Sequence, residues 1–243
     1  MQVPPLVAPT IHPRDRLAFA LDVERLEDAQ RWVEQLMPHV GVFKVGLELF
    51  VRHGPAAVHV VQRAGARCFL DLKLHDISET VARAVRAAGE SGADFLTLHA
   101  SGGRTMLERA VQSAPTHLRL LAVTVLTSLD ERALHDLGLS GGTLDVVARW
   151  ALVANSAGIR GLVCSAHEVG ALRVMLPDTY LVTPGIRPTG GDAGDQVRTA
   201  TVRDAVSHGA DLLVVGRPIR NAQDPVDAAR RIVAEIEEAL DNG

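Results

Sequence analysis

Short aliphatic runs recur along this chain at intervals of roughly 20 to 40 residues, and segments with helical spacing separate them. Most runs are apolar at consecutive positions, which is typical of parallel strands buried on both faces. They predict eight strands, at Leu17–Leu21, Val40–Val45, Arg67–Lys73, Phe95–His99, Leu120–Val125, Gly161–Cys164, Tyr180–Thr183 and Leu212–Val215. Eight strands alternating with helices in 243 residues favour an α/β fold, the (β/α)8 TIM barrel, over an open sheet.

The segments between the predicted strands repeat apolar residues three and four positions apart, as amphipathic helices do. Two such faces are Leu26, Ala29, Val33 with Leu36, and Val81, Ala84, Val85 with Ala88. Because no linker divides the chain, we expect residues 14–243 to form a single barrel domain. Four prolines interrupt residues 1–13, which we expect to be an extended arm and a poor signal peptide.

Composition favours a small-molecule substrate. The formal net charge is −4 and no long block of Lys or Arg appears, so we expect neither nucleic acid nor a membrane as a partner. Aromatic residues make up only 3% of the chain, which leaves few stacking platforms for single-stranded nucleic acid. Cys68 and Cys164 lack the spacing of a metal clip or a small disulfide framework. This fits a reducing compartment, and we expect a cytoplasmic protein.

Polar groups follow most of the predicted strands, at the end where a TIM barrel carries its active site. In chain order they are Asp22, Lys44, Asp71 with Lys73, His99, Thr124 to Ser128, Ser165, Pro184 to Arg187, and Gly216 with Arg217. The strand entrances carry mainly Gly, Ala and surface charges. The pattern therefore predicts a reactive face at the C-terminal ends of the strands.

Asp71 and Lys73 give the strongest chemical signal in the sequence. Residues i and i+2 of a strand point to the same side, so both charges are expected to project into the barrel mouth. The leucines at 70, 72 and 74 are expected to face the helices. Two buried charges without a function are unfavourable, although a buried Asp–Lys pair that only neutralises itself remains an alternative.

Asp76 has two interpretations. It stands immediately before a predicted helix and three residues before Glu79, which is the pattern of a helix N-cap with its reciprocal partner. On this pattern alone, capping is the expected role. Lys44 and Asp22 leave the two preceding strands, however, so Asp76 is also a candidate member of one charged cluster in the barrel mouth.

A resemblance to a known family is carried by residues 69–80, which read FLDLKLHDISET. This segment resembles the signature of the orotidine 5′-phosphate decarboxylases. Further segments similar to that family follow in the same order, at 20–22, 43–46, 99–103, 123–128, 182–188 and 215–219. The resemblance covers essentially the whole chain after the arm. Ser78 departs from the pattern, since the family usually has Gly or Pro there, but Ser is tolerated in a first helical turn.

The resemblance implies decarboxylation of orotidine 5′-monophosphate to uridine 5′-monophosphate, the last step of pyrimidine nucleotide synthesis, with no metal or organic cofactor. It assigns Lys73 to stabilising and protonating the C6 carbanion, and Asp71 to a position against the substrate carboxylate. Lys44 and Asp76 complete the implied catalytic set. Because no adjacent carbonyl delocalises the C6 carbanion, the site must stabilise it electrostatically, and the Lys73 ammonium group is placed to do so.

The resemblance also implies the binding residues. Phosphate contacts fall to Arg187, Gln196, Gly216 and Arg217, and the Gly-rich run from 188 to 196 has the makeup of a mobile lid. Asp22 and Thr127 are expected at the ribose and the pyrimidine. The family forms homodimers with shared active sites, in which residues matching Asp76, Ile77 and Thr80 reach into the neighbouring subunit.

Other interpretations remain open on the sequence alone. An Asp-x-Lys-x-x-Asp array also helps to bind magnesium in related phosphosugar decarboxylases and synthases. A barrel that binds nucleotide phosphates without catalysis would need a missing catalytic residue, and none is missing. For single residues, His99 is better explained as a core histidine than as a catalytic one. Thr127 could equally be a local cap for the loop after the fifth predicted strand.

Overall fold

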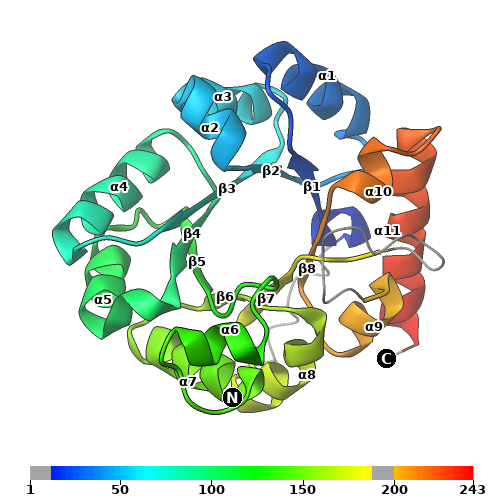
Figure 1. The fold of residues 1–243 in the computed structure, drawn as a ribbon. Coiled ribbons are helices and arrows are strands. Elements are labelled where there is room, and N and C mark those ends of the chain that lie inside the picture. The colour runs from blue at the N-terminus through cyan, green and yellow to red at the C-terminus, as the bar shows by residue number, and fades with distance from the viewer. Residues whose placement is uncertain (1–11, 188–199, 243) are drawn as a thin grey trace, which may run out of the picture.

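Eight parallel strands close into a barrel in the computed structural model, which describes residues 12–187 and 200–242 (Figure 1). The strands pair in sequence order, and β8 closes the ring against β1. They are β1 Leu17–Leu21, β2 Val42–Val45, β3 Arg67–Leu74, β4 Phe95–His99, β5 Arg119–Val123, β6 Gly161–Val163, β7 Tyr180–Thr183 and β8 Leu212–Val215. The predicted (β/α)8 TIM barrel is therefore confirmed.

Helices surround the strands on the outside of the ring (Figure 1). They are η1 Pro13–Arg16, α1 Leu26–Leu36, α2 Leu47–His53, α3 Pro55–Arg63, α4 Ser78–Glu90, η2 Ala100–Gly102, α5 Gly103–Ser113, α6 Glu131–Asp136, α7 Thr143–Ser156, α8 Ala166–Met175, α9 Val202–Ser207, α10 Arg217–Arg220 and α11 Pro225–Asp241. Of the expected arm, residues 1–11 lie outside the described part, and Pro13 already begins η1.

Apolar side chains form two layers, one inside the barrel and one between the strands and the helices. Residues 17, 19 and 21 of β1 join the outer layer, whereas Ala18 and Ala20 join the inner one. The inner layer also holds Val42, Phe69, Phe95, Leu121, Val182, Leu212 and Val214. Both faces of each strand are thus buried, which explains why the strands read as continuous apolar runs.

Aromatic rings and arginines close the N-terminal end of the barrel. The rings of Phe95 and Tyr180 stack with centroids 6.0 Å apart. The guanidinium of Arg67 lies 5.8 Å from the Phe95 ring, and that of Arg119 lies 4.5 Å from the Tyr180 ring. Burial raises the pKa of Tyr180 above its ordinary value, against the lowering effect of the nearby arginines. Both cations therefore rest on ring faces at this end.

None of the helices in the described ranges is long and apolar enough to cross a membrane. Cys68 and Cys164 are both free and buried. Burial raises the pKa of each thiol.

Candidate active site

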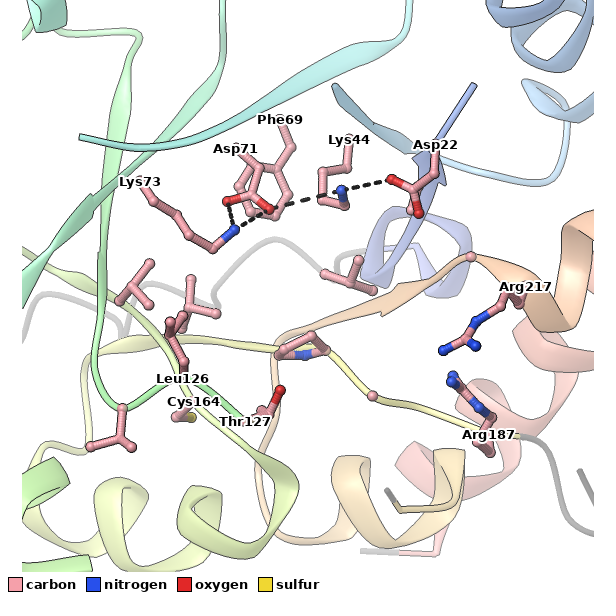
Figure 2. A pocket seen from close by; sticks show the side chains of 18 of the residues that line it. Asp22, Lys44, Phe69, Asp71, Lys73, Leu126, Thr127, Cys164, Arg187 and Arg217 are labelled. Carbon is pink, nitrogen blue, oxygen red and sulfur yellow. Dashed lines mark hydrogen bonds and ion pairs between the residues drawn. The ribbon is translucent and has the colours of Figure 1, made fainter. Parts of the chain in front are cut away.

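A cavity of about 500 Å³ opens at the C-terminal ends of the strands, where the sequence predicts a reactive face (Figure 2). Eight of the twelve predicted site residues line it: Asp22, Lys44, Asp71, Lys73, Thr127, Arg187, Gly216 and Arg217. Gln196 lies outside the described residues. The remaining three, at positions 76, 77 and 80, do not line this cavity.

Four charged side chains of alternating sign form one wall of the cavity (Figure 2). The Nζ of Lys73 lies 2.8 Å from both oxygens of Asp71. The Nζ of Lys44 lies 3.8 Å from Asp71 Oδ2 and 3.3 Å from Asp22 Oδ1. Each ammonium group therefore has a carboxylate partner, and Asp71 lies between two lysines. These two are the only lysines in the chain, and the other 23 residues of its Lys and Arg total (25 − 2) are arginines.

Asp71 is held as a carboxylate in this wall. Burial by itself raises its pKa, but the charges of Lys44 and Lys73, with hydrogen bonds from Lys73 and Thr97, more than offset that effect. The pKa of Asp71 is consequently below its ordinary value. A negative charge is thus retained in a largely buried position next to the open cavity.

Regular strand alternation does not account for the position of the Lys73 side chain at the cavity. It has a φ of 51°, and it is the one residue other than glycine with a positive φ in the described ranges. Side chains on Cβ disfavour this left-handed backbone region, so the conformation is strained. Asp71 and Lys73 do line one cavity as predicted, but a backbone irregularity, rather than a regular pleat, brings them together.

The leucines around these charges face the helices as predicted. Leu70 is fully buried in the outer layer. Leu72 and Leu74 are partly buried and pack against the same layer. The charged and apolar side chains of this segment therefore point to opposite sides of the barrel wall.

Two arginines face the cavity from the side opposite the lysines (Figure 2). Arg187 follows β7 and is 9% exposed, and its guanidinium donates to the Ile186 carbonyl at 2.9 Å. Arg217 begins α10 directly after Gly216, and both line the cavity. A Cβ atom at Gly216 would lie 3.3 Å from the Ala20 Cβ, so a side chain there would crowd β1. This side offers guanidinium groups to an anion, well apart from the lysine wall.

The loop after β5 contributes Thr127, whose side chain points toward the cavity (Figure 2). The following helix, α6, is capped by Asp130, whose Oδ1 accepts a hydrogen bond from Ala133 N at 2.8 Å. The N-cap of the helix after this loop is therefore Asp130 rather than Thr127.

The capping prediction for Asp76 is wrong. The N-cap of α4 is Ile77, and no side chain caps that helix. The Asp76 carboxylate accepts instead from the adjacent Ile77 N–H at 2.6 Å, and Glu79 pairs with Arg109 of α5 at 2.8 Å. Both members of the predicted capping box are thus engaged elsewhere. Ile77 has an exposed fraction of 73%, although it is a large apolar residue.

His99 is not fully buried, which differs from the core histidine expected from the sequence. Its ring centroid lies 5.4 Å from that of His75. Partial burial, with the nearby His75 and Lys73, lowers the pKa of His99. His99 does not line the cavity, so its position supports no direct contact with a ligand there.

Sequence reasoning missed two polar residues at this site. Arg220 lines the cavity and donates to the Asp22 carbonyl at 2.7 Å. Its position three residues after Arg217, about one helical turn, could have identified it from the sequence. Thr97 hydrogen-bonds to Asp71 and to the backbone of Lys73. Thr97 lies two residues before His99, so strand alternation places both on the same inward face of β4. This spacing could have identified Thr97 from the sequence.

No group of three or more His, Cys, Asp or Glu side chains suited to a metal ion occurs within residues 12–187 and 200–242. The carboxylates of the cavity wall are instead paired with lysines.

Comparison with known proteins agrees with this geometry. The family described as Orotidine 5'-phosphate decarboxylase / HUMPS matches residues 15–232. Orotidine 5'-phosphate decarboxylase of Anaeromyxobacter sp. (strain K) is 51% identical over 225 residues, which cover 92% of this chain and 99% of the relative. The protein of that name from Thermobifida fusca is also 51% identical, covering 91% of this chain and 95% of the relative.

A solved structure gives the same result at the level of the fold. Orotidine 5'-phosphate decarboxylase from Lactobacillus acidophilus superposes with a TM-score of 0.81 and 34% sequence identity, covering 91% of this chain and 99% of that one. The similarity therefore extends over nearly the full length of both proteins. Together with the family match, it shows that this chain belongs to the orotidine 5′-phosphate decarboxylase / HUMPS family.

Proposed function

We propose that this protein decarboxylates orotidine 5′-monophosphate to uridine 5′-monophosphate, the last step of pyrimidine nucleotide synthesis. The observation that carries the proposal is the lysine–carboxylate wall facing two arginines across one cavity. The wall suits a reacting carboxylate and carbanion, and the arginines suit a phosphate. The family membership of the chain supports the same substrate.

The proposed chemistry needs an electrostatic stabiliser and a proton donor. The bond from C6 to the carboxylate carbon breaks, carbon dioxide leaves, and the electron pair stays on C6. The Lys73 ammonium group lies beside this carbon, stabilises the negative charge and transfers a proton to it. Asp71 lies against the substrate carboxylate and orients Lys73, whose Nζ is 2.8 Å from both Asp71 oxygens. Lys44 keeps Asp71 ionised.

Binding energy from the phosphate supplies much of the remaining rate. The largest enzymatic accelerations correspond to roughly 20 kcal/mol, whereas one well-placed donor supplies about 3 to 4 kcal/mol. Contacts to a phosphate remote from C6 contribute when they order the site. We assign this role to Arg187, Gly216 and Arg217, with Gln196 as a further contact, and we assign Asp22 and Thr127 to the nucleoside.

A magnesium-dependent phosphosugar reaction is the competing proposal, because the Asp-x-Lys-x-x-Asp array at residues 71–76 resembles one that helps to bind magnesium in related phosphosugar enzymes. The position of Asp71 argues against it. Its carboxylate lies 2.8 Å from one ammonium nitrogen and 3.8 Å from another, so a divalent cation bound there would face two positive charges. The contacts of Asp71 therefore favour the metal-free reaction.

The test is the absorbance change on adding orotidine 5′-monophosphate to purified protein after exhaustive chelation. We expect the substrate absorbance to fall with formation of uridine 5′-monophosphate, at the same rate with and without added Mg²⁺. Turnover of this substrate that appears only when Mg²⁺ is restored would contradict the metal-free reaction. No turnover under either condition would reject the proposed substrate.

We further propose a homodimer with shared active sites. Asp76 does not line the cavity of its own subunit, and Ile77, three residues beyond the end of β3, is 73% exposed. A second hollow of about 230 Å³ lies beside Lys44, Asp71 and Lys73, at the start of α2. An acidic group entering this hollow from a second copy would meet both lysines. The residues at 76, 77 and 80 are therefore proposed to complete the site of the partner subunit.

Mixing two inactive variants tests the shared site. Asp76→Ala subunits combined with Lys73→Ala subunits form hybrid dimers in which one of the two sites keeps both residues. We expect activity to return toward one quarter of the wild-type value after full subunit exchange, because about half of the dimers are hybrids with one intact site. Exchange demonstrated by mass spectrometry without any recovery would exclude sharing through Asp76.

A cytoplasmic location is proposed on the basis of the cysteines. Both Cys68 and Cys164 are free and buried. Free thiols are maintained in reducing compartments. Fractionation of cells that express the tagged full chain tests this assignment.

A further inference from the structure

Thr97 lies beneath the cavity without lining it, and it is 1% exposed. Its hydroxyl group makes two hydrogen bonds of different kinds. The hydroxyl donates to Asp71 Oδ1 at 2.9 Å and accepts from the Lys73 backbone N–H at 2.9 Å. A threonine hydroxyl has one hydrogen to donate, so its donor capacity is fully used within the charged wall.

The register between β3 and β4 explains why this hydroxyl is needed. Leu70 is paired with Leu96, and Leu74 is paired with Leu98. Three residues of β3, at positions 71, 72 and 73, therefore stand opposite the single β4 residue Thr97. The regular ladder is interrupted over these positions, and the Lys73 N–H donates to a side chain of β4 instead.

The interruption coincides with the strained residue. Lys73 has a φ of 51°, and such a conformation persists only where surrounding contacts hold it. The Thr97 hydroxyl contacts the two groups whose relative position matters most, the backbone of Lys73 and the carboxylate of Asp71. The same carboxylate then meets the Lys73 Nζ at 2.8 Å. One buried hydroxyl thus fixes both ends of the Asp71–Lys73 contact.

We propose that Thr97 is a positioning residue for the decarboxylation, holding Lys73 in its left-handed backbone conformation and Asp71 in the orientation that aims the Lys73 ammonium group. The inference rests on the proposed function for its catalytic consequence. Its structural content, the hydroxyl that holds the Lys73 amide, stands independently of the substrate.

Three substitutions isolate the hydroxyl group. Thr97→Val removes both hydrogen bonds and keeps the shape, Thr97→Ser keeps the hydroxyl and removes a methyl group, and Thr97→Ala provides a second variant without the hydroxyl. Thr179→Val is the matched control, because Thr179 is 3% exposed and precedes β7 at the opposite end of the barrel. It reports what the loss of a buried threonine hydroxyl does in general.

Steady-state kinetics separate positioning from general packing. We expect Thr97→Val and Thr97→Ala to lower kcat by roughly 100-fold, which is typical of a misplaced catalytic group, with KM changed less than about threefold. Thr97→Ser should stay within about fivefold of wild type, and Thr179→Val should leave kcat unchanged. Equal losses of kcat in the Ser and Val variants, or wild-type kcat in Thr97→Val, would overturn the proposal.

Hydrogen exchange of the Lys73 amide gives a second measurement that requires no activity. In Thr97→Val this amide loses its acceptor, so it should exchange at least about tenfold faster relative to the Leu70 amide of the same strand. Thr97→Ser should restore the protection. If the wild type does not decarboxylate the substrate, the proposed function fails, and the exchange measurement still decides whether Thr97 holds Lys73. An unchanged Lys73 exchange rate rejects the inference in either case.

Discussion

The two ends of the barrel use charged side chains in different ways. At the N-terminal end, Arg67 and Arg119 lie over the rings of Phe95 and Tyr180, and the strands there are regular. At the C-terminal end, Asp71 lies between two lysines, next to a strained backbone and an open cavity. Charge that rests on aromatic rings stabilises the fold, whereas charge gathered at an irregular strand end is available for chemistry.

Lys73→Ala is expected to have the largest effect, and it tests whether the charges at the C-terminal end serve catalysis. We expect kcat to fall by at least about 1,000-fold, as when one stabilising donor is removed from a transition state. The protein should still fold and bind uridine 5′-monophosphate. The measurement is kcat with orotidine 5′-monophosphate, alongside a thermal unfolding curve. Normal turnover would mean that the C-terminal charges are structural, as those at the N-terminal end are.

Arg217→Ala tests the opposite side of the cavity. Loss of a charge-assisted phosphate contact corresponds to about 1.5 to 3 kcal/mol, so the nucleotide Kd should rise roughly 10- to 150-fold. Binding of the phosphate-free nucleoside should change little. Arg231→Ala is the matched control, because Arg231 pairs with Asp227 on the outer helix α11. Calorimetric titration of both ligands gives the answer, and equal losses for nucleotide and nucleoside would contradict a phosphate role.

Lys44→Met tests the electrostatics of the wall. The folded pKa of Asp71 is lowered despite burial, with Lys44 as the largest of the lowering influences. The stability from ionised Asp71 is therefore full above the pKa of the unfolded chain and is lost as pH falls through the lower folded value. Removing Lys44 raises the folded pKa, so the acid limb of kcat should move to higher pH.

Lys44→Arg keeps the charge and should keep the acid limb near its wild-type position. The pH profile of kcat for the two variants and the wild type makes the comparison. An unmoved acid limb in Lys44→Met would show that Asp71 does not depend on this lysine for its ionisation.

Arg119→Ala is expected to have the smallest effect. Removing a cation from the Tyr180 ring should lower the free energy of unfolding by about 0.5 to 1 kcal/mol and leave kcat unchanged. Denaturant unfolding and steady-state kinetics measure the two quantities, with Arg132→Ala on the exposed face of α6 as the control. A fall in kcat without a fall in stability would break the division between the two ends.

The strands could be predicted because both of their faces are apolar. The bounds of β1, β4, β7 and β8 agree with the sequence pattern, and those of the other four differ by one or two residues. Val40 and Val125 are buried but lie just outside β2 and β5. Burial makes such residues apolar whether or not their backbone pairs with a neighbouring strand, so composition alone does not set the strand ends.

The charged wall could be predicted only in part. Asp71 and Lys73 do line one cavity as expected, but an irregular backbone rather than regular alternation brings them together. The positive φ of Lys73 depends on β4 and has no signal in β3 alone. Thr97 escaped notice for the same reason, since its partners are distant in sequence. Asp76 was assigned to a cap from local spacing, and a non-local contact, Arg109 with Glu79, removed the reciprocal partner.

The confinement of lysine to one cavity has a practical consequence. With Lys44 and Lys73 as the only ε-amines, the surface of the protein presents its positive charge through arginine side chains. An amine-directed acylating reagent therefore has the active site and the N-terminal amine as its targets, so its inactivation rate measures access to the cavity. Reductive methylation with ¹³C-formaldehyde would give a spectrum of two ε-amine signals. Their titration would report the protonation of both lysines directly, with and without bound nucleotide.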